Sequence, residues 1–159
     1  MAEELSRSAR KIQDLLTSRG AECEVVQLPA STRTSAEAAA AVGCSVAQIA
    51  KSIVLRTAQS DKAVIVVASG VNRVNEAKVA GYIGEPIRKA DADFVREKTG
   101  FVIGGVPPIG HAEPIDTIVD EDLMKLGDVW AAAGTPNSVF KVSAENLLAL
   151  TGGTLRSIK

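Results

Sequence analysis

Aromatic residues are scarce in this 159-residue chain, which holds three Phe, one Tyr and one Trp. Hydrophobic residues make up 46% of the chain and charged residues 23%, a composition typical of a globular protein with an aliphatic core. The scarcity of aromatics counts against a surface that stacks nucleic-acid bases on aromatic platforms. The net charge of −1 likewise lacks the basic excess of domains that bind nucleic acid along its backbone.

Cysteine and histidine are equally rare, with Cys23, Cys44 and His111 as their only representatives. Two cysteines outside a CxxC pair make no disulfide framework, so we expect reduced thiols. One histidine and two separated cysteines do not make a zinc site, and we expect neither a metal nor a cofactor. The P-loop and G-x-S-x-G motifs are absent, and a Ser-His-Asp triad or a Cys-His pair would depend on His111 alone.

Long apolar runs are also missing. The longest strongly apolar run, AVIVVA at residues 63–68, is too short to span a bilayer. The N-terminal segment is charged from its third residue and lacks the apolar region of a signal peptide. We therefore expect a soluble, cytoplasmic protein that forms a single domain over residues 1–159.

Hydrophobic periodicity and turn residues predict an α+β domain, in which strands follow one another through short turns and helices lie outside. Capping residues and helical spacing predict helices at 5–20, 36–43, 46–50, 76–83, 92–99 and 144–150. Apolar and β-branched runs predict strands at 23–28, 51–57, 63–69, 86–89, 101–103, 115–119, 129–133 and 138–142.

Lys51 is the first candidate functional residue, at a predicted helix-to-strand junction in QIAKSIVLR. Burying an ammonium group among the apolar neighbours of this lysine is costly unless the group finds a partner. One interpretation is a side chain that extends past the strand end to solvent. The other is a lysine directed into a cleft, where it binds an anion or polarises a carbonyl.

The second candidate is the segment GGVPPIGH, residues 104–111, which holds three glycines, two prolines and the only histidine. Glycine permits positive φ and close approach of the backbone to a ligand, whereas proline fixes φ. Together they can hold N–H groups directed at one oxygen, as in an oxyanion hole. A rigid surface crossover would have the same composition, and composition alone leaves both interpretations open.

Four segments together resemble the YbaK/prolyl-tRNA-synthetase-associated domain family: IAKSIVLR, AVIVVASG, VNEAKVAGYIG and TGFVIGGVPPIGH. The resemblance runs from about residue 20 to the C-terminal helix. Its specific feature is the order of a lysine strand, an apolar strand, a short helix and a G-x-x-x-P loop, and residues 104–108 satisfy that last motif. The family resemblance implies a mixed, mainly antiparallel sheet curled towards a barrel, with flanking helices.

Members of this family are free-standing aminoacyl-tRNA deacylases or the editing domain of bacterial prolyl-tRNA synthetases. The resemblance implies that this chain hydrolyses the ester between a mischarged amino acid and the CCA end of a tRNA, most often proline tRNA. It implies aminoacyl-tRNA as a partner and prolyl-tRNA synthetase as a further one. It also implies that water is activated by the 2′-hydroxyl of the substrate and by backbone groups, which explains why a side-chain triad is absent.

The resemblance also implies a set of site residues. Lys51 lies against the CCA end, and Gly104 and Gly105 surround the ester as catalytic backbone. The expected substrate-binding residues are Arg33, Thr34, Ser52, Val106, Pro107, Pro108 and His111. We expect His111 to support the loop rather than to act as a base. Rigid aliphatic walls favour small acyl groups, namely alanine, 2-aminobutyrate, serine or cysteine.

Two other functions fit the sequence. One is a non-catalytic module on the same fold that binds tRNA or a synthetase and regulates it. The acidic balance and the scarce aromatics weaken this alternative, because phosphate contacts dominate RNA affinity. The other is a hydrolase for a small ester or amide unrelated to tRNA. The sequence sets neither the amino acid removed, nor the tRNA, nor the oligomeric state.

Overall fold

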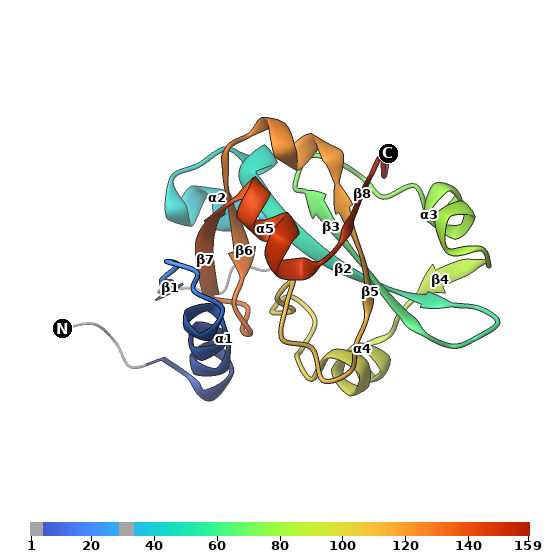
Figure 1. Cartoon of the computed structure of the whole chain (residues 1–159), viewed down its shortest axis with the longest axis horizontal. Helices are drawn as coiled ribbons and strands as arrows, with labels where there is room; N and C mark the ends of the chain where they lie inside the picture. Colours follow the sequence, from blue (N-terminus) through green and yellow to red (C-terminus); the bar gives the residue numbers. More distant parts are fainter. Residues whose placement is uncertain (1–4, 29–33) are drawn as a thin grey trace.

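A computed structural model describes residues 5–28 and 34–159 of the chain (Figure 1). Within this part, the helices are α1 Arg7–Ser18, α2 Ser35–Val42, α3 Glu76–Ile83, α4 Ala92–Thr99 and α5 Ala144–Thr151, with 3₁₀ helices η1 Val46–Gln48 and η2 Glu121–Lys125. The strands are β1 Val25–Gln27, β2 Ile49–Thr57, β3 Ala63–Ser69, β4 Ile87–Lys89, β5 Asp116–Asp120, β6 Asp128–Ala132, β7 Ser138–Ser143 and β8 Thr154–Arg156. None of these helices is long and apolar enough to cross a membrane.

All described strands join one mixed sheet in the order β1-β7-β6-β2-β3-β5-β8, and β4 pairs with β2 beside this path. The β2–β3, β2–β4, β6–β7 and β1–β7 pairs are antiparallel. The β2–β6, β3–β5 and β5–β8 pairs are parallel. Figure 1 shows β2 crossing the view diagonally while β5 and β7 run nearly upright, so the sheet is strongly twisted. The expected α+β class with a mostly antiparallel sheet is confirmed.

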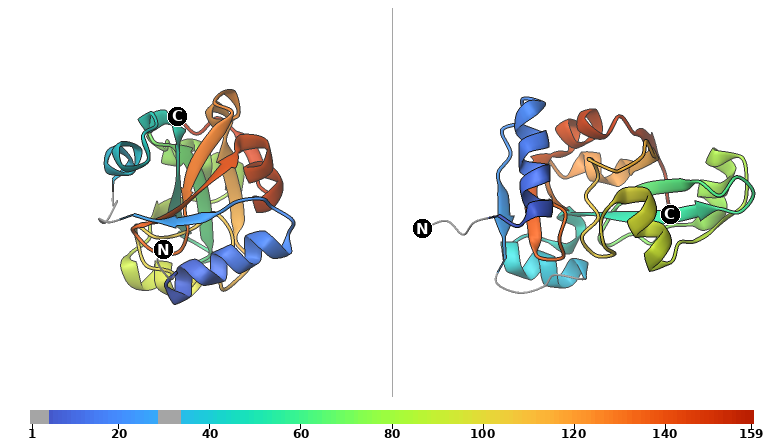
Figure 2. Two further views of the ribbon diagram at one scale, coloured as in Figure 1. Left: turned by 90° about the vertical axis from the view of Figure 1, so that its left-hand side faces the viewer. Right: turned by 90° about the horizontal axis from the view of Figure 1, so that it is seen from below.

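The centre of the sheet is β3, in which every residue is buried. Alternate side chains of this strand serve two cores. Ile65 and Val67 pack in a cluster with α1, α4 and α5, whereas Val64 and Val66 pack in a second cluster with α3. The two further views in Figure 2 show helices on both sides of the sheet. The continuous apolar run at residues 63–68 is the pattern typical of a strand that is buried on both faces.

Local capping chemistry sets the helix boundaries close to where the sequence predicts them. The side chains of Asn75, Asp91 and Ser143 accept hydrogen bonds from the third residue of α3, α4 and α5, respectively. The glycines that follow these helices adopt the left-handed conformation typical of a helix end. These signals are readable from sequence because they involve residues only a few positions apart.

One predicted strand was wrong, and two short elements were missed. Residues 101–103, predicted as a strand, form a bend and a turn that leads into the loop, and Phe101 is buried in the main core. The short elements η2 and β8 were missed. The residues of β8 are exposed, so their sequence lacks the apolar alternation of a half-buried strand, and only pairing with β5 defines the element.

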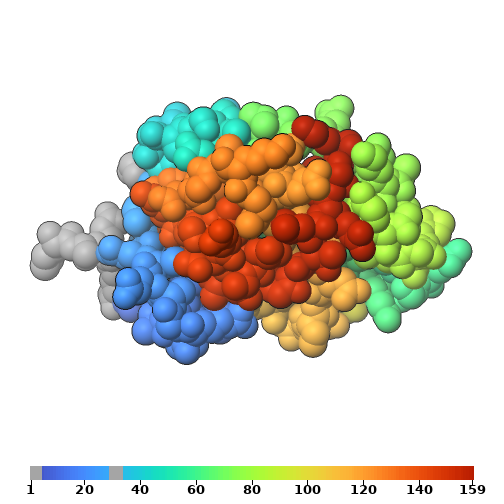
Figure 3. Space-filling view, turned by 45° about the horizontal axis from the view of Figure 1, so that its top comes forward, coloured from blue at the N-terminus to red at the C-terminus, as the bar shows by residue number. Residues whose placement is uncertain are grey.

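A buried carboxylate fixes the segment that follows β5. Asp120 is 1% exposed, and its side chain accepts hydrogen bonds from the backbone N–H of Ser69, the Asn72 amide and the backbone N–H of Asp122 at 3.0, 2.8 and 2.9 Å. Asp122 in turn binds Lys159, which lowers the pKa of this carboxyl to about 2. Figure 3 shows the C-terminal residues, in red, lying against the green helix α3.

We predict that Asp120→Ala lowers the free energy of unfolding by about 3 kcal/mol, because several donors then lose their acceptor in a buried site. Asp116→Ala is the matched control, since Asp116 lies in the same strand but is exposed. Chemical denaturation of both variants measures the difference. Equal stability of the two would contradict the role given to Asp120.

Candidate active site

A pocket that Lys51 lines lies where β2 and β6 separate. These strands pair only at Ile49–Trp130 and Ala50–Ala131 and then diverge. The cavity that opens there has a volume of about 320 Å³, within the range of small-molecule sites. Its walls come from β2, β6, the start of β7, helices α2 and α4, and the loop that follows α4. A local break in the sheet thus creates the site.

Lys51 is the only charged residue among those that line the pocket in the described part of the chain. The remaining lining residues are aliphatic, small or neutral polar, and Trp130 is the one aromatic among them. Neither His111 nor a cysteine is in this set, and no carboxylate is. The described residues of the pocket therefore hold an ammonium group but no side chain that acts as a general base at neutral pH.

The alternation of β2 divides the pocket residues between two faces. Lys51 shares a face with Ile49, which packs with Ala38 of α2 and with Trp130. Lys51 is exposed, and its ammonium group makes no ion pair with a carboxylate of residues 5–28 and 34–159. Ser52 lies on the opposite face, and its Oγ is buried without a hydrogen-bond partner among the described residues. The side chain of Lys51 therefore reaches solvent, as in the first interpretation from the sequence, and it lies at the rim of a pocket rather than in the core.

Helix α2 begins at the pocket. Thr34 is its N-cap: the Thr34 Oγ1 accepts a hydrogen bond from the Glu37 N–H at 3.1 Å. Ser35 also lines the pocket, and its buried Oγ has no hydrogen-bond partner in the part of the chain that the structure describes. Arg33, predicted to bind substrate, lies outside the described residues.

The two adjacent glycines of the loop have different surroundings. Gly104 lines the pocket, has a φ of 89°, and would place an added Cβ in open space. Gly105 is buried, and an added Cβ would lie 2.7 Å from the Cα and carbonyl carbon of Thr135. The N–H of Gly105 already donates to the carbonyl of Val102 at 3.0 Å. The close approach that this glycine permits is thus to the neighbouring turn, in contrast to the predicted approach to a ligand.

The remaining loop residues separate into two groups. Val106 lines the pocket, whereas Pro107 is buried outside it. Pro108 and His111 line a second, more open groove between α1 and the segment 108–117. His111 Nε2 donates to the carbonyl of Pro107 at 2.7 Å, which ties the two ends of this turn together. The structure thus brings Thr34, Lys51, Ser52, Gly104 and Val106 into one pocket, and places His111 and Pro108 in the groove.

Burial lowers the pKa of His111 below its ordinary 6.5, the Pro107 hydrogen bond raises it in part, and nearby Lys11 lowers it further. The imidazole is therefore neutral at pH 7. Both cysteines are free, and burial raises their pKa. Neither lines the pocket, so the described structure places no thiolate there.

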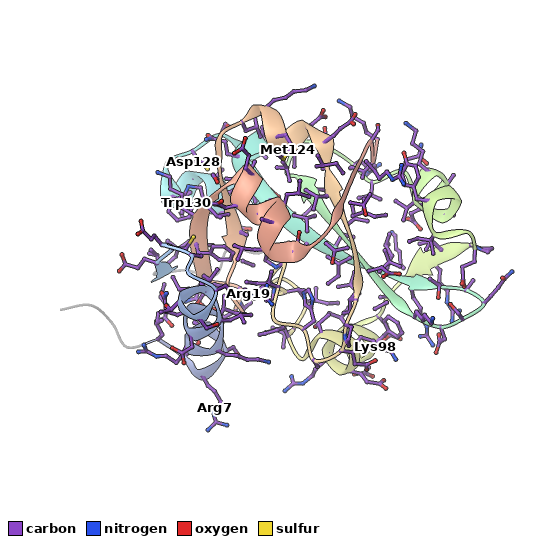
Figure 4. All side chains as sticks on the ribbon, in the orientation of Figure 1. Arg7, Arg19, Lys98, Met124, Asp128 and Trp130 are labelled. Atoms are coloured by element: carbon purple, nitrogen blue, oxygen red, sulfur yellow. The ribbon has the colours of Figure 1, made fainter. Side chains whose placement is uncertain are left out.

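Several lining residues were not predicted from sequence. Trp130 lies on β6 beside α2, as labelled in Figure 4, and Ser138 and Val139 come from the start of β7. Ile103, at the tip of the turn before Gly104, is 55% exposed. The single tryptophan of an aromatic-poor chain was a signal that could have drawn attention to β6.

Comparison with known proteins shows the family to which the chain belongs. A model of the aminoacyl-tRNA editing domain matches residues 29–150, a range that includes the pocket residues. The chain belongs to the aminoacyl-tRNA editing domain family. The family predicted from the lysine strand and the G-x-x-x-P loop is thereby confirmed.

Relatives of this editing domain extend over nearly its full length. A structure described as a "putative trans-editing enzyme for prolyl tRNA synthetase" is 47% identical, with a TM-score of 0.92, and the match covers 98% of this chain and 99% of that one. The hypothetical protein APE2540 is 30% identical, with a TM-score of 0.86 over 93% and 98% of the two chains. The uncharacterized protein YwhH of Bacillus subtilis (strain 168) is 29% identical over 140 residues, 88% of each chain.

We predict that Gly105→Ala destabilises the protein by about 2–3 kcal/mol, because its Cβ meets backbone atoms that cannot move aside. Gly104→Ala is the matched control and costs about 1 kcal/mol, since only its positive φ opposes a side chain. Urea unfolding of both variants checks the order. A Gly104 variant less stable than the Gly105 variant would refute this assignment.

We predict that the fold loses stability as the pH falls below about 6.5, because the unfolded chain then protonates His111 more readily than the folded one. The stability that comes from keeping His111 neutral is fully present above pH 6.5. It is lost as the pH decreases towards the lower pKa of His111 in the folded state. His111→Gln keeps a side-chain N–H but cannot titrate, so its stability should change less between pH 7.5 and 5.5. Thermal unfolding of wild-type protein and His111→Gln across this pH range tests the prediction. Melting temperatures that change equally with pH in the two proteins would exclude the effect.

Proposed function

We propose that this editing domain is a trans-acting deacylase that hydrolyses the ester of a small mischarged amino acid on tRNA, with proline tRNA as the expected carrier. The observation that carries the proposal is the pocket beside β2, where Lys51 is the only charge among the described lining residues. The family and the relative described as a trans-editing enzyme support it. The partners are the CCA end of aminoacyl-tRNA and, for delivery, prolyl-tRNA synthetase.

The walls of the pocket favour a small acyl group. Ile53 and Val54 of β2, Val95 of α4, Val106 of the loop and Val139 of β7 supply rigid aliphatic surface. Such walls exclude large side chains by overlap, but one methylene changes binding by only about 1–3 kcal/mol. Alanine and 2-aminobutyrate are therefore the first expected substrates, with serine and cysteine after them, and prolyl-tRNA is spared.

The chemistry we propose uses the substrate as its own catalyst. Water adds to the carbonyl carbon of the ester, and the 2′-hydroxyl of the terminal adenosine orients this water. The proton that the water loses passes through the 2′-hydroxyl to the departing 3′-oxygen. The carbon–oxygen bond then breaks, giving a free amino acid and a tRNA with a 3′-hydroxyl. Lys51 holds the phosphate of the terminal nucleotide at the rim, and backbone N–H groups near Gly104 and Ser52 stabilise the oxyanion.

We predict that Lys51→Ala lowers kcat/KM for proline tRNA mischarged with alanine by at least about 10²-fold. The substitution removes one member of a charge pair with the phosphate. The matched control is Lys62→Ala, an exposed lysine in the β2–β3 hairpin outside the pocket. The measurement is loss of the aminoacyl group across alanyl, 2-aminobutyryl, seryl, cysteinyl and prolyl esters.

Three outcomes would contradict this proposal. A folded Lys51→Ala variant with wild-type rates would show that the site is elsewhere. Wild-type protein that binds the charged tRNA but hydrolyses none of the esters would favour a non-catalytic regulatory module. Equal hydrolysis of the prolyl ester would exclude an editing role, because the enzyme would destroy the correct product.

A further inference from the structure

Strand β2 has a gap along one of its edges. On the first edge it pairs with β3 without interruption from Ala50 to Arg56. On the second edge, β6 pairs only with Ile49 and Ala50, and β4 only with Leu55–Thr57. Among the described residues, therefore, no strand pairs with the second edge of β2 between Lys51 and Val54, all of which line the pocket.

The backbone of Ser52 faces this gap. Gly70 N–H donates to the carbonyl of Ile49 at 2.8 Å, and Thr57 N–H donates to the carbonyl of Lys62 at 2.9 Å. Odd-numbered residues of β2 therefore bond to β3 and its hairpin. Because successive residues of a strand direct their N–H and C=O groups to opposite edges, those of Ser52 point toward the gap.

The side chain of Ser52 adds a further polar group. Its Oγ is buried and forms no hydrogen bond with residues 5–28 or 34–159, although buried polar groups in folded proteins are nearly always paired. One residue thus presents a backbone donor, a backbone acceptor and a hydroxyl beside an otherwise largely aliphatic cavity. Such an arrangement costs stability unless a ligand completes it.

We propose that the aminoacyl group of the substrate binds in this gap as a missing strand residue, an inference that rests on the proposed deacylase function. Its α-ammonium donates to the carbonyl of Ser52, and its ester carbonyl accepts from the Ser52 N–H. An extended α-amino acyl group has its nitrogen and carbonyl oxygen on the same side. The two bonds therefore match a hydrogen-bonded pair of an antiparallel sheet.

This pairing has a consequence for the reaction. When water adds to the ester carbon, the carbonyl oxygen gains negative charge while it accepts from Ser52 N–H, so the same bond becomes stronger. The N–H of Gly105 does not take this role, because it donates to Val102. The pairing also requires an α-amino group with hydrogens to donate, so the site selects α-aminoacyl esters over N-acylated ones.

The test compares two variants at one position. Ser52→Ala removes the hydroxyl, and replacement of residue 52 by lactic acid removes the hydroxyl and also exchanges the backbone N–H for oxygen. We expect Ser52→Ala to lose about tenfold in kcat/KM for alanyl-tRNA, the effect of one hydrogen bond. The lactic acid variant should lose a further factor of about 10²–10³, typical of a lost oxyanion donor.

The matched control is the α-hydroxy analogue of leucine at position 55, which removes an N–H directed at β3 and leaves the pocket intact. It should cost stability but not rate under conditions where all variants are folded. Wild-type protein should also hydrolyse N-acetylalanyl-tRNA far more slowly than alanyl-tRNA. A lactic acid variant as active as Ser52→Ala would overturn the inference, as would equal rates on the two substrates.

A binding experiment separates this inference from the proposed function. The probe is 3′-alanylamino-3′-deoxyadenosine, an amide that is not hydrolysed, and the readout is the NMR signal of the Ser52 amide. We expect a downfield shift of the Ser52 amide proton that an N-acetylated probe does not cause. Absence of binding, or binding that leaves this amide unchanged, refutes the pairing. If the shift occurs but wild-type protein hydrolyses no charged tRNA, the deacylase function fails while the pairing stands.

Discussion

The change of partner along β2 is the constraint on which the site depends. One edge of this strand is held by β3 over its length, and the other is divided between β6 and β4. A continuous neighbour would satisfy every backbone group but would fill the space. The break leaves a cavity inside the sheet while β3, buried throughout, supplies the rigidity that the gap removes. Stability and an open pocket are thus achieved on opposite edges of one strand.

The chemistry of the pocket follows from what this arrangement can present. A gap in a sheet offers backbone donors and acceptors in fixed directions, and its walls are the aliphatic side chains that pack the surrounding core. It offers few titratable groups, and among the described lining residues Lys51 alone is charged. The single histidine instead ties the loop together through Pro107, in a groove separate from the pocket. An ester that carries its own hydroxyl suits such a site.

Much of the fold could be predicted from the sequence because its signals are local. The caps Asn75, Asp91 and Ser143 lie within four residues of the groups they bond, and the buried strand at 63–69 is recognisable from its apolar composition. Strand β8 could not be found in this way, since exposed residues become a strand only by pairing with β5. The predicted strand at 101–103 failed for the opposite reason: Phe101 is buried by the core without belonging to the sheet.

Prediction of the site divides along the same line. The lysine strand and the loop were recognisable as motifs, and the family they indicated is confirmed. The gap itself was not predictable, because it arises from the registers of β4 and β6, which are far from β2 in sequence. Composition also could not distinguish Gly104, which faces the pocket, from Gly105, which packs against Thr135. Adjacent identical residues acquire different roles only in three dimensions.

The central claim is that the substrate, and not a side chain, supplies the group that handles the proton. Its most direct test uses proline tRNA mischarged with alanine. The rate at which wild-type protein deacylates this tRNA is compared between a form that ends in 2′-deoxyadenosine and one that ends in adenosine. The account predicts that removing the 2′-hydroxyl slows hydrolysis by at least about 10²-fold, the usual contribution of proton transfer by a positioned group. Equal rates on the two substrates would contradict it and would require a base in the protein.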